Sequence, residues 1–247
     1  MAEQDRIGTC RLCGQSKPLC NSHIVPEFCY GRAYDAQHRV LDMDLRGRNR
    51  HPVRYIQKGY REPLLCRDCE TRISRYEDRF AKFWYGSSGL PDTIDMRCRF
   101  LVLSGVDCVS FRLFHLSVLW RAAVSRLCAS VELGPYEAKL REVVRSGFLP
   151  QQEHFPVLGQ VLVDETGTVM HGLVTSPCPY ESPPSTAYRA CYAGCEWHVV
   201  VTDHPTEDQR TLINEFGRQG RVVLMCTDWR HTGTAKALAD AYRRRKK

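Results

Sequence analysis

The chain has 247 residues, of which 43% are hydrophobic and 26% are charged, and this composition excludes an intrinsically disordered chain. The most apolar stretch, residues 100–123, is interrupted by charged residues, and the N-terminus lacks the apolar segment of a secretory signal. We therefore expect a cytoplasmic protein that is neither secreted nor inserted in a membrane, and that keeps its 13 cysteines as thiols. The formal net charge of +7 and the basic residues 243–247 favour a polyanionic partner.

Two pairs of cysteines with a two-residue gap lie in the N-terminal third: Cys10 and Cys13, then Cys66 and Cys69. A two-residue gap lets a tight turn present both sulfurs of a pair to one ion, and four thiolates complete the tetrahedral shell of Zn²⁺. A closed shell of this kind predicts a structural zinc. Cys20 is an alternative ligand, and four unrelated buried thiols are the alternative to a zinc site.

Basic residues form two groups in the same region. The first lies in an irregular stretch and consists of Arg46, Arg48, Arg50, Arg54 and Lys58. The second lies on a helix predicted over residues 67–85 and consists of Arg72, Arg75, Arg79 and Lys82. Guanidinium groups can bind phosphate oxygens in pairs, so both groups are candidate nucleic-acid contacts, with a solvated surface as the alternative. The Gly- and Ser-rich run after this helix marks an expected boundary between domains at 1–88 and 89–247.

The second part of the chain predicts helices and strands without a recognisable motif. A buried helix is expected over 106–127 and an amphipathic helix over 136–146. Val-rich segments then predict strands at 155–163, 169–175, 195–202 and 221–226, and further helices are expected at 207–216 and 234–244. The expected class is α+β, with a mixed or antiparallel sheet in an accessory domain that binds a protein partner or forms a homodimer. A second zinc could bind to Cys178, Cys191, Cys195 and His198, although free cysteines are common in buried strands.

One segment between the cysteine pairs carries a family resemblance. It reads Asn21-Ser-His-Ile-Val-Pro26, and Glu70 follows the second pair directly at the start of the predicted helix. In this arrangement residues 10–85 resemble the HNH endonucleases in their zinc-containing ββα-metal (treble-clef) form. The run from Leu116 to Arg121 and the Tyr-Glu pair at 76–77 are similar to small bacterial HNH-type proteins, some of which are linked to phage defence.

The resemblance implies a DNA endonuclease in which His23 is the general base and Glu70 binds Mg²⁺ or Mn²⁺. The imidazole would take a proton from the water that attacks a phosphodiester, and the metal would stabilise the phosphorane and the departing 3′ oxygen. Ser22 stands where the family has an Asp ligand, and the family's central Asn is missing near Glu62. We therefore expect Glu62 to orient the imidazole and Glu77, on the same helix face as Glu70, to assist the metal. The basic residues on the helix that bears Glu70 would then lie beside this reaction centre.

Each of these assignments has a structural alternative. His23 would then be an imidazole that bonds a backbone carbonyl beneath the zinc turn. Glu70 would be a favourable charge at the positive end of a helix dipole. The corresponding rival function is a zinc-stabilised module that binds nucleic acid or protein without catalytic activity.

Overall fold

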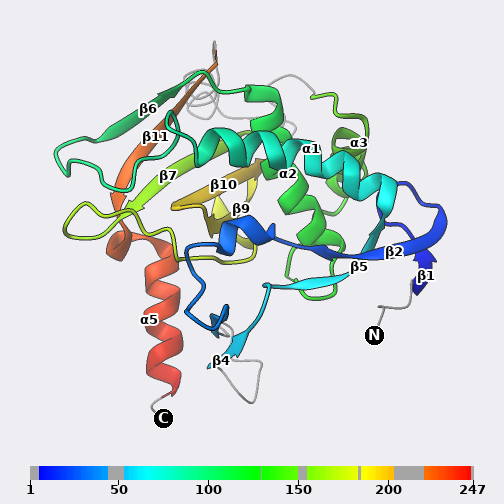
Figure 1. Ribbon diagram of the computed structural model, residues 1–247, viewed down its shortest axis with the longest axis horizontal. Helices are drawn as coiled ribbons and strands as arrows, with labels where there is room; N and C mark the ends of the chain where they lie inside the picture. Colours follow the sequence, from blue (N-terminus) through cyan, green and yellow to red (C-terminus); the bar gives the residue numbers. More distant parts are fainter. Residues whose placement is uncertain are drawn as a thin grey trace.

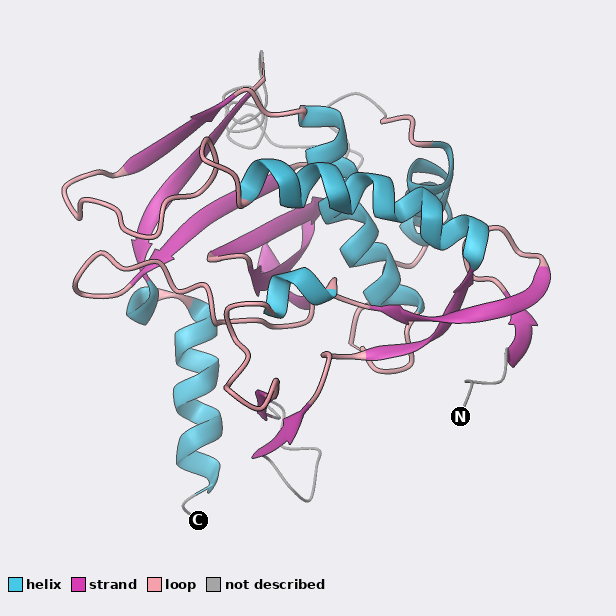
Figure 2. Ribbon diagram, in the orientation of Figure 1, coloured by secondary structure: helices cyan, strands magenta, loops and turns pink. Residues whose placement is uncertain are grey.

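The computed structural model describes residues 6–43, 53–128, 130–149, 155–182, 185–202 and 220–245, which form an α+β fold (Figures 1 and 2). The strands are β1 (Arg6–Thr9), β2 (Ser16–His23), β3 (Val40–Met43), β4 (Val53–Ile56), β5 (Arg61–Cys66), β6 (Phe100–Ser104), β7 (Val157–Val163), β8 (Cys178–Ser182), β9 (Ser185–Tyr192), β10 (Cys195–Val201) and β11 (Arg221–Asp228). The helices are α1 (Arg67–Trp84), α2 (Cys108–Val124), α3 (Tyr136–Ser146) and α5 (Gly233–Arg245), with short 3₁₀ turns η1 (Glu27–Tyr30) and η2 (Trp229–His231).

The N-terminal part is a small antiparallel sheet followed directly by a helix. Its strand order is β1-β2-β5, with His23 opposite Arg61 at the end of the β2–β5 ladder. Helix α1 begins at the residue after β5, so the second cysteine pair lies at the junction of strand and helix. β3 and β4 form a separate two-stranded hairpin in the loop that connects β2 and β5. This arrangement places both cysteine pairs and His23 around the paired strands β2 and β5.

The second part is a six-stranded mixed sheet with the order β6-β11-β7-β10-β9-β8. β11 pairs in parallel with β7, and the other neighbours are antiparallel, which confirms the expected mixed sheet. Helix α2 is buried on most faces and packs against α1, α3 and β10, as its continuous apolar sequence predicts. At the end of α1, Trp84 Nε1 donates a 2.9 Å hydrogen bond to the carbonyl of Ala193 next to β10. The two sheets are thus joined through α1 and α2 (Figure 1).

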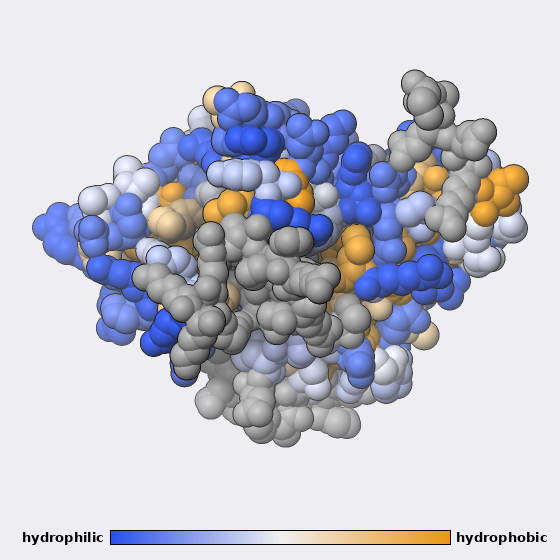
Figure 3. Space-filling model, turned by 90° about the horizontal axis from the view of Figure 1, so that it is seen from below, coloured by the Kyte–Doolittle hydropathy of each residue, from blue (hydrophilic) through white to orange (hydrophobic). Residues whose placement is uncertain are grey.

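Both hydrophobic clusters contain residues from each side of the expected boundary at 88–89. One cluster joins Cys10, Leu65 and Ile73 to α2, α3 and β10. The other joins Phe80 and Trp84 to the six-stranded sheet. The two expected domains therefore share their cores. Seen from below, most of the visible surface of described residues is hydrophilic, with small hydrophobic areas between (Figure 3). Among the described residues, no helix has the length and hydropathy needed to cross a membrane.

Several predicted elements are confirmed, and one is wrong. Helices α1, α2, α3 and α5 and strands β7, β10 and β11 lie where the sequence predicts them, while the expected helix at 207–216 lies outside the described residues. The expected strand at 169–175 does not form, because the N–H groups of Val169, Met170 and His171 donate to Asp92, Leu162 and Val169 instead of to one neighbouring strand. Strands β6, β8 and β9 were not predicted. β8 contains Pro179, and β6 lies in the apolar stretch that runs on into α2.

Candidate metal centre and neighbouring charge cluster

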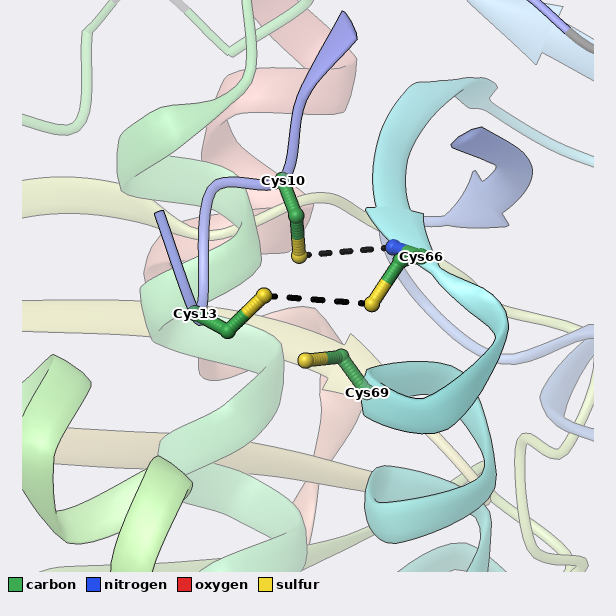
Figure 4. Close-up of side chains that lie close together, drawn as sticks. All are labelled: Cys10, Cys13, Cys66 and Cys69. Atoms are coloured by element: carbon green, nitrogen blue, oxygen red, sulfur yellow. Dashed lines mark hydrogen bonds between the residues drawn. The ribbon is translucent and has the colours of Figure 1, made fainter. Parts of the chain in front are cut away.

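The four cysteines of the two pairs converge on one point (Figure 4). Cys10 and Cys13 lie on the turn between β1 and β2, where Gly14 adopts a φ of 75°, while Cys66 ends β5 and Cys69 lies in the first turn of α1. Their sulfur atoms all lie within 4.8 Å of one another. Such a group of four can surround a single ion, as the sequence predicts.

Hydrogen bonds hold the cysteine turn against the start of α1. The N–H of Cys66 donates to Cys10 Sγ at 3.3 Å, and the N–H of Arg11 donates to the carbonyl of Leu64 at 3.0 Å. Burial, followed by hydrogen bonding to the Cys66 thiol, raises the pKa of the Cys69 thiol. A bound cation would offset that cost, and four sulfur donors in this arrangement fit the soft, tetrahedral preference of Zn²⁺. The donor set therefore supports a structural zinc site.

His23 lies at the end of β2, beside a left-handed turn. Lys58 and Gly59 have φ values of 61° and 65°, and this turn brings the carbonyl of Lys58 to 2.9 Å from His23 Nε2. Because a carbonyl only accepts, Nε2 carries the proton and Nδ1 carries the lone pair. Glu27 Oε2 lies 3.7 Å from the same Nε2. Burial lowers the pKa of His23 against the opposing effect of Glu27, which favours the neutral form of the imidazole.

Glu70 faces the interior from the first turn of α1. Its Oε1 atom is buried and has no hydrogen-bond partner within the described part of the chain. Burial raises the pKa of Glu70, whereas a hydrogen bond with Ser22 and the charge of Arg121 oppose that shift. The Ser22 hydroxyl also accepts a 3.2 Å hydrogen bond from the N–H of Leu65 in β5. The same hydroxyl donates to the carbonyl of Cys20 at 3.3 Å, so Ser22 holds the end of β2 to β5 beside the carboxyl group on α1.

The buried guanidinium of Arg121 completes a charge cluster that also contains Glu70 and Glu77. The side chain of Arg121, on α2, is 2% exposed, and its Nη2 lies 2.7 Å from Glu77 Oε1. Its Nη1 donates a 3.0 Å hydrogen bond to the backbone carbonyl of His23. Sequence reasoning placed Glu77 at the metal and did not identify Arg121. One signal was available, since an arginine inside a helix that is apolar on most faces requires a buried acidic partner.

Glu62 does not lie beside the imidazole as expected. Glu62 on β5 pairs with Ser22 on β2, whereas His23 pairs with Arg61. Glu62 and His23 therefore occupy opposite faces of the β2–β5 strand pair. Its carboxylate accepts a 2.9 Å hydrogen bond from the N–H of Arg126. The group that contacts the His23 ring at hydrogen-bonding distance is the carbonyl of Lys58, a backbone atom that no sequence motif marks.

The helical basic group lies on the far side of α1 from the charge cluster. At about 3.6 residues per turn, Arg72, Arg75, Arg79 and Lys82 fall roughly opposite the inward-facing Glu70 and Glu77, and all four are exposed. The expectation that they lie on the side of α1 that bears Glu70 is wrong for this reason.

Some of the basic residues also have partners within the protein. Arg54 pairs with Asp42, Arg72 donates to the carbonyl of Arg145, and Arg79 pairs with Asp107. Lys58, Arg75 and Lys82 are exposed, and Arg46, Arg48 and Arg50 lie outside the described residues.

The expected second zinc site does not form. Cys191 and Glu196 pair across β9 and β10, so Cys195 lies on the opposite face of the sheet and its thiol is buried in the core. Instead, Glu196 accepts a hydrogen bond from Gln160 at 2.8 Å and contacts His198 and Thr234. Among described residues, the four N-terminal cysteines are the one group of three or more potential ligands close enough to share a metal ion.

No protein-family model matches the chain, and no curated protein and no solved structure matches it either.

Proposed function

We propose that the protein is a metal-dependent endonuclease of the HNH type that hydrolyses phosphodiester bonds in DNA. The observation that carries this proposal is the position of Arg121, whose Nη1 donates a 3.0 Å hydrogen bond to the His23 carbonyl and whose charge acts on Glu70. It brings the strand end that bears His23 against the helix start that bears a buried carboxyl group, beside the four-cysteine cluster. The order of cysteine turn, hairpin and helix supports the finer description of this part as a treble-clef or ββα-metal fold.

His23 has the properties of a general base. Its Nε2–H is held by the Lys58 carbonyl, which fixes the ring and leaves the Nδ1 lone pair to accept a proton from water. The lowered pKa keeps this lone pair free at neutral pH. The Lys58 carbonyl and Glu27 together supply the orienting contacts that the family obtains from an Asn side chain.

Glu70 fits the role of the carboxylate for a hard cation. Its buried Oε1 lacks a hydrogen bond, and the adjoining hydroxyl of Ser22 adds a second oxygen. Mg²⁺ commonly takes one or two protein carboxylates and completes its shell with water and substrate phosphate, so a lone carboxylate is a sufficient anchor. When bound, Mg²⁺ or Mn²⁺ supplies the positive charge that stabilises the leaving 3′ oxygen.

Plasmid cleavage tests this function. Supercoiled DNA incubated with Mg²⁺ or Mn²⁺ should be nicked by the wild type, and both His23→Ala and Glu70→Ala should lose about 10²-fold or more in rate. Asp68→Ala and His231→Ala are matched controls, because Asp68 is an exposed carboxylate in the same helical turn and His231 is exposed in η2. Cleavage that survives both site variants would refute the assignment. The resemblance to phage-defence proteins adds the proposal that the cleaved DNA is foreign to the cell.

One observation favours a second candidate, a zinc-stabilised binding module without catalytic activity. The Arg121 guanidinium already lies 2.7 Å from Glu77 and contributes positive charge at Glu70, so the protein itself supplies part of the charge that a metal would bring. The binding module would be established if the wild-type protein retards DNA or RNA in a gel but cuts neither with Mg²⁺ or with Mn²⁺.

A further inference from the structure

A pocket of about 510 Å³ lies between the end of α1 and the start of α2. Counted along α1 at about 1.5 Å per residue, Lys82 at the pocket is roughly 18 Å from Glu70, so this pocket is separate from the proposed reaction centre. Its volume falls within the range of small-molecule sites. Gly105 lines it with a φ of 81°, and a Cβ built there would meet no atom within 4 Å, so the pocket is open on that side.

The floor of the pocket is aromatic. Phe80 and Phe111 are largely buried, with ring centroids 5.9 Å apart, and Phe80 is already stacked on Phe114 and Trp84. Phe83 is half-buried beside them and is the ring left to face a ligand. Flat aromatic rings favour contact with another flat, partly polar ring, as in the stacking of nucleic-acid bases on Phe side chains. The exposed part of the Phe83 ring therefore suits a base better than a flexible alkyl chain.

The rim of the pocket is cationic. Lys82 is exposed and has no hydrogen-bond or ion-pair partner in the part of the chain that the structure describes. The acidic group at the rim, Asp107, is engaged on both oxygens: it accepts from the N–H of Ser110 at 3.1 Å and from Arg79 Nη1 at 3.1 Å.

Hydroxyl groups stand beside these cations. Ser87 and Ser88, on the turn after α1, line the pocket opposite the first turn of α2. Lys82, the remaining donors of Arg79 and these hydroxyls together offer a phosphate several hydrogen bonds next to the aromatic floor.

We propose that this pocket binds a nucleoside monophosphate, with the base on the aromatic floor and the phosphate at Lys82 and Arg79. The group can come from two sources, a free nucleotide or the phosphorylated end of a nucleic-acid strand. The proposal does not depend on nuclease activity, and it assigns a second nucleotide contact at the far end of α1.

Isothermal titration of the full chain with AMP, adenosine and inorganic phosphate tests the proposal. AMP should bind with one-to-one stoichiometry, more tightly than adenosine or phosphate alone. Lys82→Glu should weaken AMP by about tenfold or more, and Ser88→Trp, which fills the pocket, should abolish binding. Lys236→Glu is the matched control, because Lys236 is an exposed lysine on α5, and its AMP affinity should stay within about twofold of the wild type.

A 5′-phosphorylated hexadeoxyadenylate distinguishes the two sources. Binding about tenfold or more tighter than AMP, lost when the 5′ phosphate is removed, identifies a strand end, whereas equal or weaker binding identifies a free nucleotide. Absence of saturable binding by AMP and by the oligonucleotide would overturn the proposal. Equal loss of affinity in Lys82→Glu and Lys236→Glu would also overturn it, because the attraction would then be general rather than local.

Discussion

The buried ion pair between Arg121 and Glu77 yields the most quantitative prediction. With the Arg121 side chain 2% exposed and the Glu77 side chain 17% exposed, Arg121→Met leaves a carboxylate in the interior without its counter-charge. Removing one partner of a buried pair costs about 3–5 kcal/mol. For a chain of this size each kcal/mol lowers the melting temperature by about 2–4 °C, so a fall of about 6–20 °C is expected.

The double variant Arg121→Met/Glu77→Leu separates the unpaired charge from the lost packing. Replacing a buried pair with apolar residues of similar volume is often neutral, so the double variant should recover most of the lost stability. Arg97→Met is the control, because Arg97 pairs with Asp95 at 2.6 Å but its side chain is 90% exposed, and it should change stability by less than about 1 kcal/mol.

Urea unfolding followed by circular dichroism measures all of these variants. If Arg121→Met lowers the free energy of unfolding by less than about 1 kcal/mol, Arg121 does not stabilise the protein by neutralising the buried carboxylate of Glu77. A double variant less stable than Arg121→Met would show that the packing of these side chains outweighs their charges.

Three further predictions concern the metal site, the six-stranded sheet and the imidazole of His23. Elemental analysis of protein purified without chelator should give about one zinc per chain, and Cys13→Ser should lose it, whereas a zinc-free wild type would exclude the site. The Glu196 pKa is lowered to about 2, because hydrogen bonds from His198 and Thr234 outweigh the effect of burial. Since this pKa lies below the unfolded value, Glu196 adds about 3 kcal/mol of stability above about pH 4.5 that is lost as the pH falls towards about 2, and Glu196→Gln should remove that part of the pH dependence. Proton NMR should give His23 a pKa below its usual 6.5, and a value above that would contradict the burial of its ring.

The sequence predicts best those features that depend on short spacing. The two Cys-X₂-Cys pairs identify the ligand group. The apolar periodicity of α1 and the continuous apolar sequence of α2 give both helices to within a few residues. The position of the basic group on α1 was also within reach, because counting about 3.6 residues per turn from Glu70 places it on the far side.

Features that depend on tertiary contacts were not predicted. Arg121 is 44 residues from its partner Glu77 in the chain, and nothing local indicates that α2 would turn this residue toward α1. The orienting contact of His23 comes from the carbonyl of Lys58, and every residue carries a carbonyl, so composition does not single it out. The second cysteine group was misjudged because the register of β9 and β10, which places Cys195 on the other face, is set by pairing and not by spacing.

The cysteine cluster and the charge cluster are mechanically linked through the same two helices. Cys69 and Glu70 are neighbours in the first turn of α1, while Cys10 and Cys66 pack in one core with residues of α2 such as Leu116 and Trp120. Loss of the metal would release the start of α1, and with it the contact between Glu70 and Ser22. Since Arg121 is carried by α2, its distance to Glu77 depends on the same packing. A structural metal here would therefore hold the spacing between His23 and Glu70 without taking part in any chemistry, and, if the proposed function holds, chelation should abolish DNA cleavage even when Mg²⁺ is supplied in excess.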